Sequence, residues 1–163
     1  IINSNENLEK VIDFDETCFY QEQNLDNVYV YTKFKAEEVV LEYIEKGLEA
    51  NILRVGNLTG RYSDLKFQHN VSENAFSNKI KTFIDIGYFP ESNSDIYLEF
   101  TPVDECAKAI IKISEYFNMS HNMFHLYDNE HVYICEFVKI LSDIGLKLNI
   151  VEDEEFVKVI EDI

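Results

Sequence analysis

Basic residues are scarce in this chain of 163 residues: Lys and Arg number 14, against 31 Asp and Glu, and the formal net charge is -17. A negatively charged surface disfavours electrostatic binding to nucleic acid or to an anionic membrane. The sequence also lacks an apolar run of the roughly 20 residues that a membrane-spanning helix needs, and its opening segment IINSNENLEK lacks the basic and apolar regions of a signal peptide. We therefore expect an acidic cytoplasmic protein.

Cysteine is rare as well, and Cys18, Cys106 and Cys135 are widely separated and form no C-x-x-C pair. This pattern argues against a disulfide framework or a structural zinc site, and we expect buried thiols. His121 and His125 have the i, i+4 spacing of a helical metal pair, but MFHLY around His125 is typical of a strand, so no metal site is expected.

The apolar content is sufficient for a folded domain, because 46% of the residues are hydrophobic and the length is that of one ordinary domain. No internal repeat, low-complexity segment or Pro/Gly/Ser linker interrupts the chain, and the part up to about residue 25 is an irregular lead-in.

Helices and strands are expected to alternate after this lead-in. Asn27 can cap a helix that ends at Gly47 and buries one face, and ANILRV, residues 50–55, is typical of a buried strand. That face carries Phe34, Val40, Leu41 and Ile44. Further helices are expected at about 73–86, after Asp104 as N-cap, at about 133–143 and from about 153. A turn is expected at 87–94, and strands are expected at 96–100, 123–127 and 146–151. This alternation predicts an α/β fold with parallel crossovers.

A Tyr and a Lys four residues apart on a helix lie on one face at roughly 6 Å, where the ammonium can lower the pKa of a phenol from about 10. Such a phenol can protonate a carbonyl oxygen as hydride arrives. The spacing occurs for Tyr29 with Lys33, Tyr31 with Lys35, and Tyr62 with Lys66. Tyr62 falls in an expected loop, whereas Tyr29 and Tyr31 point about 200° apart on one helix, so spacing alone leaves two pairs open.

The segment Y-V-Y-T-K-F-K-A-E, residues 29–37, resembles the helix motif Tyr-x-x-Ser/Thr-Lys-aromatic-x-Ala/Ser-Glu of extended short-chain dehydrogenases. This resemblance implies that Tyr29 and Lys33 are the catalytic pair and that Glu37 is the motif's acid. Tyr31 and Lys35 then fall on variable positions.

Two later segments extend the resemblance. R-V-G-N-L-T-G, residues 54–60, is similar to the family's Arg-x-x-Asn-x-x-Gly segment, and F-T-P-V-D-E-C-A, residues 100–107, is similar to its Pro-Val-Asp-x-x-Ala helix start. Ligands bind beyond the carboxyl ends of strands in open α/β sheets, which suits a nicotinamide ring near the first of these segments. The cofactor-binding residues that the resemblance implies are Tyr29, Lys33, Val55, Gly56, Asn57 and Leu58.

The segment LRVGNLTGRY, together with FHLYDN and DEEF later in the chain, resembles one branch of the extended short-chain dehydrogenases in particular. This branch is the thioester reductase domain of non-ribosomal peptide synthetases. The resemblance implies an oxidoreductase that uses NADPH to release a peptidyl or acyl thioester from the phosphopantetheine of a carrier protein, as an aldehyde or an alcohol. It implies the later part of a Rossmann-like doubly wound sheet, residues 1–60 and about 96–130, and a small, mostly helical substrate lobe, about 61–95 and 131–163.

One part of the family pattern is not found. The glycines at 47, 56, 60, 87 and 145 cannot form the Gly-x-x-Gly-x-x-Gly turn that cradles the cofactor pyrophosphate. Ser4 and Thr17 match the family's substrate-holding hydroxyl by position only. We therefore expect a C-terminal fragment of a reductase domain that alone binds NADPH poorly and turns over nothing.

Two other functions remain open on the sequence. A nucleotide-sugar epimerase or dehydratase of the same superfamily keeps the chemistry, but RYSDLKFQHN after Gly60 offers only Arg61, Lys66 and His69 to a nucleotide diphosphate. A non-catalytic remnant that docks a carrier protein is the alternative from another class.

Overall fold

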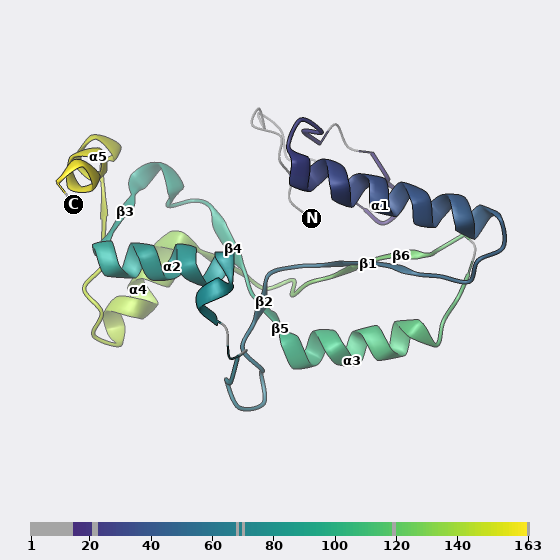
Figure 1. The fold of residues 1–163 in the computed structure, drawn as a ribbon. Coiled ribbons are helices and arrows are strands. Elements are labelled where there is room, and N and C mark those ends of the chain that lie inside the picture. The colour runs from purple at the N-terminus through teal and green to yellow at the C-terminus, as the bar shows by residue number, and fades with distance from the viewer. Residues whose placement is uncertain (1–14, 21–22, 68, 70, 119, 163) are drawn as a thin grey trace. The chain divides into compact units, whose positions relative to one another are not determined.

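The computed structural model describes residues 15–20, 23–67, 69, 71–118 and 120–162 of the chain. These residues form two compact units (Figure 1). The first unit contains the described residues up to Gly56 together with Asp104–Tyr127, and the second contains Asn57–Val103 and the described residues from Asp128 onward. The roles expected for a cofactor part and a substrate part stay predictions.

A pair of parallel strands is the centre of the first unit. β1 (Ile52–Val55) pairs with β6 (Met123–Leu126) over its whole length. Figure 1 shows α1 (Val28–Glu45) and α3 (Val103–Ser114) on opposite sides of this pair, with α1 running opposite to β1. Parallel strands covered on both faces by helices are typical of α/β folds, so the predicted fold class is confirmed.

The predicted signals define both ends of α1. The Asn27 side-chain oxygen accepts hydrogen bonds from the backbone N–H groups of Tyr29 and Val30, at 3.0 and 3.3 Å, and so satisfies donors that the helix leaves free. The helix ends at Glu45, and Gly47 follows with a φ of +99°, which glycine adopts without strain. Ile44 of the predicted apolar face is buried, and Phe34, Val40 and Leu41 are half-buried.

The second unit combines short strand pairs with helices. β2 (Leu58–Thr59) is parallel to β5 (Thr101–Pro102), β3 (Tyr88–Pro90) is parallel to β8 (Asn149–Val151), and β4 (Tyr97–Glu99) is antiparallel to β7 (His131–Tyr133). Its helices are α2 (Ala75–Ile86), α4 (Ile134–Asp143) and α5 (Asp153–Glu161), with 3-10 turns η1 (Val71–Glu73) and η2 (Glu91–Asn93).

Phe89 is at the core of the second unit. Its side chain is fully buried, and the Phe83 ring stacks on it with the ring centroids 4.3 Å apart. The buried residues packed in this cluster are Phe89, Ile134, Val138, Leu141 and Leu148. A strand and a helix far apart in the sequence therefore share one core.

Three local expectations are corrected. Residues 88–90 form β3 rather than part of a turn, because β8 supplies a ladder of hydrogen-bond partners that the local sequence cannot reveal. α3 begins at Val103, so Asp104 lies in its first turn and not at the N-cap. Among the three free cysteines, Cys106 is buried and Cys18 half-buried, but Cys135 is exposed.

None of the helices in the described part of the chain is both long enough and apolar enough to cross a membrane.

Replacement of Phe89 by alanine should lower the free energy of unfolding by about 3–5 kcal/mol, because the change leaves a cavity that the surrounding side chains fill only partly. Urea unfolding followed by circular dichroism measures this. Ile144→Ala, at a residue that is 71% exposed in the same unit, should change the free energy by no more than about 0.5 kcal/mol. Equal effects of the two changes would contradict this account of the core.

Candidate functional site

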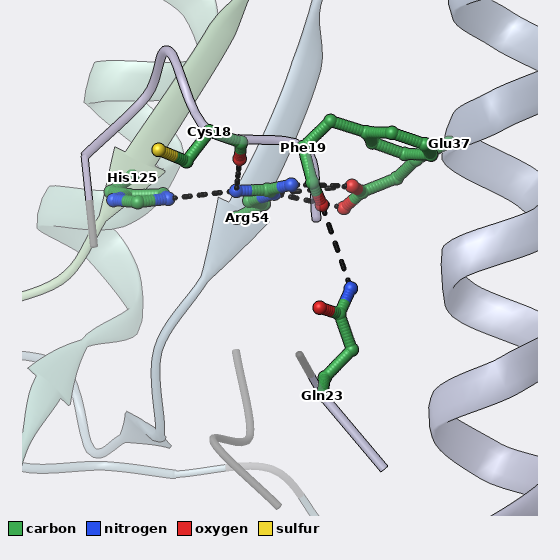
Figure 2. Close-up of polar contacts among 6 residues, drawn as sticks. All are labelled: Cys18, Phe19, Gln23, Glu37, Arg54 and His125. Atoms are coloured by element: carbon green, nitrogen blue, oxygen red, sulfur yellow. Dashed lines mark hydrogen bonds and ion pairs between the residues drawn. The ribbon is translucent and has the colours of Figure 1, made fainter. Parts of the chain in front are cut away.

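A buried arginine joins several segments of the first unit (Figure 2). The Arg54 side chain, only 4% exposed, donates from Nε to Oε1 of Glu37 at 3.0 Å and from Nη2 to Oε2 at 2.7 Å. Its Nη1 donates to the carbonyl oxygen of Cys18 at 3.2 Å and lies 3.2 Å from Nε2 of His125. The lead-in, α1, β1 and β6 therefore meet at one guanidinium.

Alternation along β1 explains why Arg54 points inward. Ile52 and Arg54 are both buried, whereas Leu53 and Val55 are half-buried, and side chains two residues apart lie on one face of a strand. Because Arg54 contacts Glu37, this is the face that meets α1. A guanidinium can be buried at this position only because its charge is paired and its donors are occupied.

The contact between Arg54 and His125 fixes the tautomer of the imidazole. A guanidinium only donates, so Nε2 of His125 is the acceptor and the ring proton is on Nδ1. Burial is the main cause that lowers the pKa of His125 below its ordinary 6.5; the charge of Arg54 acts in the same direction, and Glu16 and Glu37 oppose it. The ring is therefore neutral at pH 7.

Tyr29 and Lys33 lie beside the face of α1 that carries Glu37, the partner of Arg54. At about 100° per residue, Tyr29 lies about 80° and Lys33 about 40° around the helix from Glu37. Nζ of Lys33 is 5.6 Å from the centroid of the Tyr29 ring, and Tyr29 is 58% exposed. The pair flanks the packed face and reaches solvent.

The competing pair on α1 points elsewhere. Tyr31 and Lys35 lie about 120° and 160° around the helix from Glu37, on the outward side. Nζ of Lys35 is 5.9 Å from the Tyr31 ring centroid, so the ammonium–ring contact is common to both pairs. Lys35 also donates to Glu38 at 2.6 Å, and this hydrogen bond raises the pKa of Lys35. Orientation, not spacing, separates the two pairs.

The Arg54–Glu37 contact also sets the level of the pair along the strand. α1 rises about 1.5 Å per residue and β1 about 3.3 Å, and the two run in opposite directions (Figure 1). With ideal rises and antiparallel axes, Lys33, four residues before Glu37 and about 6 Å along the axis, is expected near the level of Gly56. Tyr29 lies about 6 Å further on. Both side chains are therefore expected toward the carboxyl end of β1, the end at which ligands bind in open α/β sheets.

The backbone of the loop after β1 is already engaged. The Gly56 N–H donates to the carbonyl oxygen of Leu126 at 2.9 Å, extending the β1–β6 ladder. In the second unit, the Asn57 N–H donates to Oε2 of Glu99 at 2.6 Å, and the Asn57 carbonyl accepts from the Thr101 N–H at 2.9 Å. These two N–H groups are therefore not free donors for a nicotinamide carboxamide, whereas Gly56 without a Cβ still permits a close approach.

The second glycine of the same motif has a structural explanation. A Cβ added at Gly60 would lie 3.0 Å from the carbonyl oxygen of Leu65. Arg61 and Lys66 close this loop with a backbone hydrogen bond of 2.8 Å. A side chain at position 60 would therefore crowd the backbone of this loop.

Two residues named from the sequence add nothing to the site, and one was missed. Ser4 lies outside the described residues, and Thr17 donates from both its N–H and its hydroxyl to Asp15, at 2.8 and 2.6 Å. The sequence suggests His125 only as half of a possible metal pair with His121. His125 joins the site because the β1–β6 register pairs it with Arg54, which no local signal in the sequence could show.

Comparison with protein families agrees with this geometry. Residues 2–110 match the model of an NAD-binding family described as Male sterility protein. The chain belongs to this family. None of the curated proteins compared with the chain matches it.

Three solved structures that resemble this chain are described as reductase domains or contain one. An archaeal thiolation-reductase di-domain from a non-ribosomal peptide synthetase is 37% identical, with a TM-score of 0.83 over 92% of this chain and 40% of that one. The reductase domain of the Aureusimine biosynthetic cluster is 25% identical, with a TM-score of 0.81 over 94% and 40%. The terminal R domain of the myxalamid PKS-NRPS pathway, 24% identical with a TM-score of 0.67 over 82% and 33%, shares the fold. This chain therefore spans less than half the length of these proteins.

Acidification should destabilise the chain partly through His125. Its pKa is lowered in the folded state, so below about pH 6.5 the unfolded state binds more protons and stability falls as the pH falls toward the folded pKa. His125→Gln keeps a neutral acceptor but does not titrate, so the unfolding midpoint in urea should fall less between pH 7 and pH 5 than in the wild type. His121→Gln, at an exposed histidine, should retain the wild-type slope. A wild-type slope in His125→Gln would contradict the assigned role of burial.

Proposed function

We propose that this chain is the later part of an NADPH-dependent reductase domain that releases a peptidyl or acyl thioester from a carrier protein. Membership of an NAD-binding family and the similarity to two structures with reductase domains, one of them from a non-ribosomal peptide synthetase, support a reductase. The observations that support the proposal are the Lys33 ammonium 5.6 Å from the Tyr29 ring centroid and the buried Arg54–Glu37 pair that joins the same helix to β1.

The chemistry divides into a reduction and a release. A bound reduced nicotinamide cofactor would supply hydride to the thioester carbonyl carbon. Tyr29 donates its phenolic proton to the carbonyl oxygen, and the product is a hemithioacetal. Lys33 stabilises the phenolate that Tyr29 leaves behind. The C–S bond then breaks, the hydroxyl proton passes to the departing sulfur of phosphopantetheine, and the acyl group leaves as an aldehyde; a second reduction gives the alcohol.

The described residues fit a cofactor at this position in part. The Lys33 ammonium can donate to ribose hydroxyls near the end of β1, and Gly56 leaves room for the flat ring. Val55, Asn57 and Leu58 stay proposed contacts, with the amide donors of Gly56 and Asn57 already committed to Leu126 and Glu99. The preference for NADPH over NADH rests on the family resemblance.

Substitutions on α1 test which pair is catalytic. In a reductase domain extended to the length of its relatives, Tyr29→Phe removes the proton donor but keeps the ring, so turnover should fall on the order of 10²-fold or more. Lys33→Ala should weaken both cofactor binding and turnover. Tyr31→Phe and Lys35→Ala are the matched controls and should cost little. NADPH oxidation with a carrier-loaded thioester measures all four.

Two outcomes would overturn parts of this proposal. Larger losses from Tyr31→Phe and Lys35→Ala would move the site to the outward face of α1. Activity of the extended wild type with UDP-sugars, but not with a carrier-loaded thioester, would replace the proposed substrate class by that of an epimerase or dehydratase.

Chain length provides a separate test. The 163 residues contain no Gly-rich strand-to-helix turn to supply backbone donors and a helix dipole to the pyrophosphate. Calorimetry should therefore show no saturable NADPH binding to these residues alone, and saturable binding to the extended domain. Tight binding to the 163 residues would mean that the pyrophosphate is held elsewhere.

A further inference from the structure

We propose that Glu37, Arg54 and His125 position the proposed catalytic pair by fixing the rotation of α1 over β1. These three residues are called the rotation lock below. The inference rests on the proposed function, because its effect is exerted through Tyr29 and Lys33. None of the three needs to touch substrate or cofactor.

Two hydrogen bonds from Arg54 to Glu37 make the rotation lock depend on the orientation of the two side chains. Nε and Nη2 of Arg54 hold both carboxylate oxygens of Glu37, at 3.0 and 2.7 Å. A planar guanidinium that donates two parallel hydrogen bonds fixes the orientation of the carboxylate. An ammonium group would leave that orientation free. The Cys18 carbonyl and Nε2 of His125, both 3.2 Å from Nη1, hold the guanidinium from its other end (Figure 2).

The position of Glu37 transmits this constraint to the pair. Side chains lie about 5 Å from a helix axis, so a rotation of about 20° moves them by roughly 2 Å. Even a misplacement of about 1 Å can cost on the order of 10²-fold in rate. Tyr29 and Lys33 lie within about 80° of Glu37 on the same rigid helix, and therefore rotate with it.

Burial distinguishes this contact from an ordinary surface pair on the same helix. The side chains of Arg54 and Glu37 are 4% and 20% exposed, whereas those of Lys35 and Glu38, also paired, are 45% and 47% exposed. Exposed pairs contribute little to stability. Buried pairs are often replaceable by apolar residues without loss of stability, so what the Arg54–Glu37 pair supplies is geometry.

The test uses the extended reductase domain and three variants. Glu37→Gln removes the negative charge and keeps a side chain of similar size. Arg54→Lys keeps the positive charge but loses the pair of hydrogen bonds that the guanidinium donates to the carboxylate. Each should lower kcat by about 10-fold or more and weaken NADPH binding at least threefold, with the KM for the carrier-loaded thioester within about twofold. Glu38→Gln, on the neighbouring carboxylate, should leave all three within about twofold. If Glu37→Gln does not fold, Arg54→Lys carries the same comparison.

A double-mutant cycle separates positioning from general destabilisation. If the lock acts through Tyr29, Glu37→Gln should reduce kcat by less than about twofold once Tyr29 is already Phe. A purely structural role would reduce it by the same factor in both backgrounds, and that result overturns the inference.

Failure of the proposed function is visible separately. A wild type that binds NADPH but does not reduce the thioester refutes the function. The lock is then judged on NADPH affinity alone, and equal affinities of Glu37→Gln and Glu38→Gln refute it.

Discussion

The ion pair between Arg54 and Glu37 is the buried charged contact that joins α1 to β1 in the first unit. It is the point where a helix and a strand that run in opposite directions are held in register by paired charges. Once that point is fixed, the rise and twist of regular structure place every other side chain of α1 relative to β1. The same guanidinium also donates to the Cys18 carbonyl of the lead-in and contacts His125 of β6, so two further segments meet at one buried charge.

The position of Glu37 distinguishes two Tyr–Lys pairs that have the same four-residue spacing. Two Tyr–Lys pairs occur on α1, and in both of them the ammonium lies within 6 Å of the ring centroid. They differ in their angle to Glu37. Of the two pairs, Tyr29 and Lys33 lie next to the face of α1 that carries Glu37, and Tyr31 and Lys35 lie on the outward side.

The loop that follows β1 shows how a shared motif can combine different roles. At Gly60, an added Cβ would crowd the carbonyl oxygen of Leu65. The Asn57 peptide is held on both sides, by the Glu99 carboxylate and by the Thr101 N–H. These contacts fix the backbone of the loop at Asn57.

Local signals in the sequence determined the helices, the α/β class and the family. Asn27 and Gly47 define the ends of α1 because capping and left-handed backbone conformations involve only neighbouring residues. Tertiary structure alone decided the strand at 88–90, which needs β8 as its partner, and the exposure of Cys135. It also decided that His125, 71 residues from Arg54 in the chain, accepts from its guanidinium. Contacts of that kind depend on strand register, and a register arises only when distant segments pair.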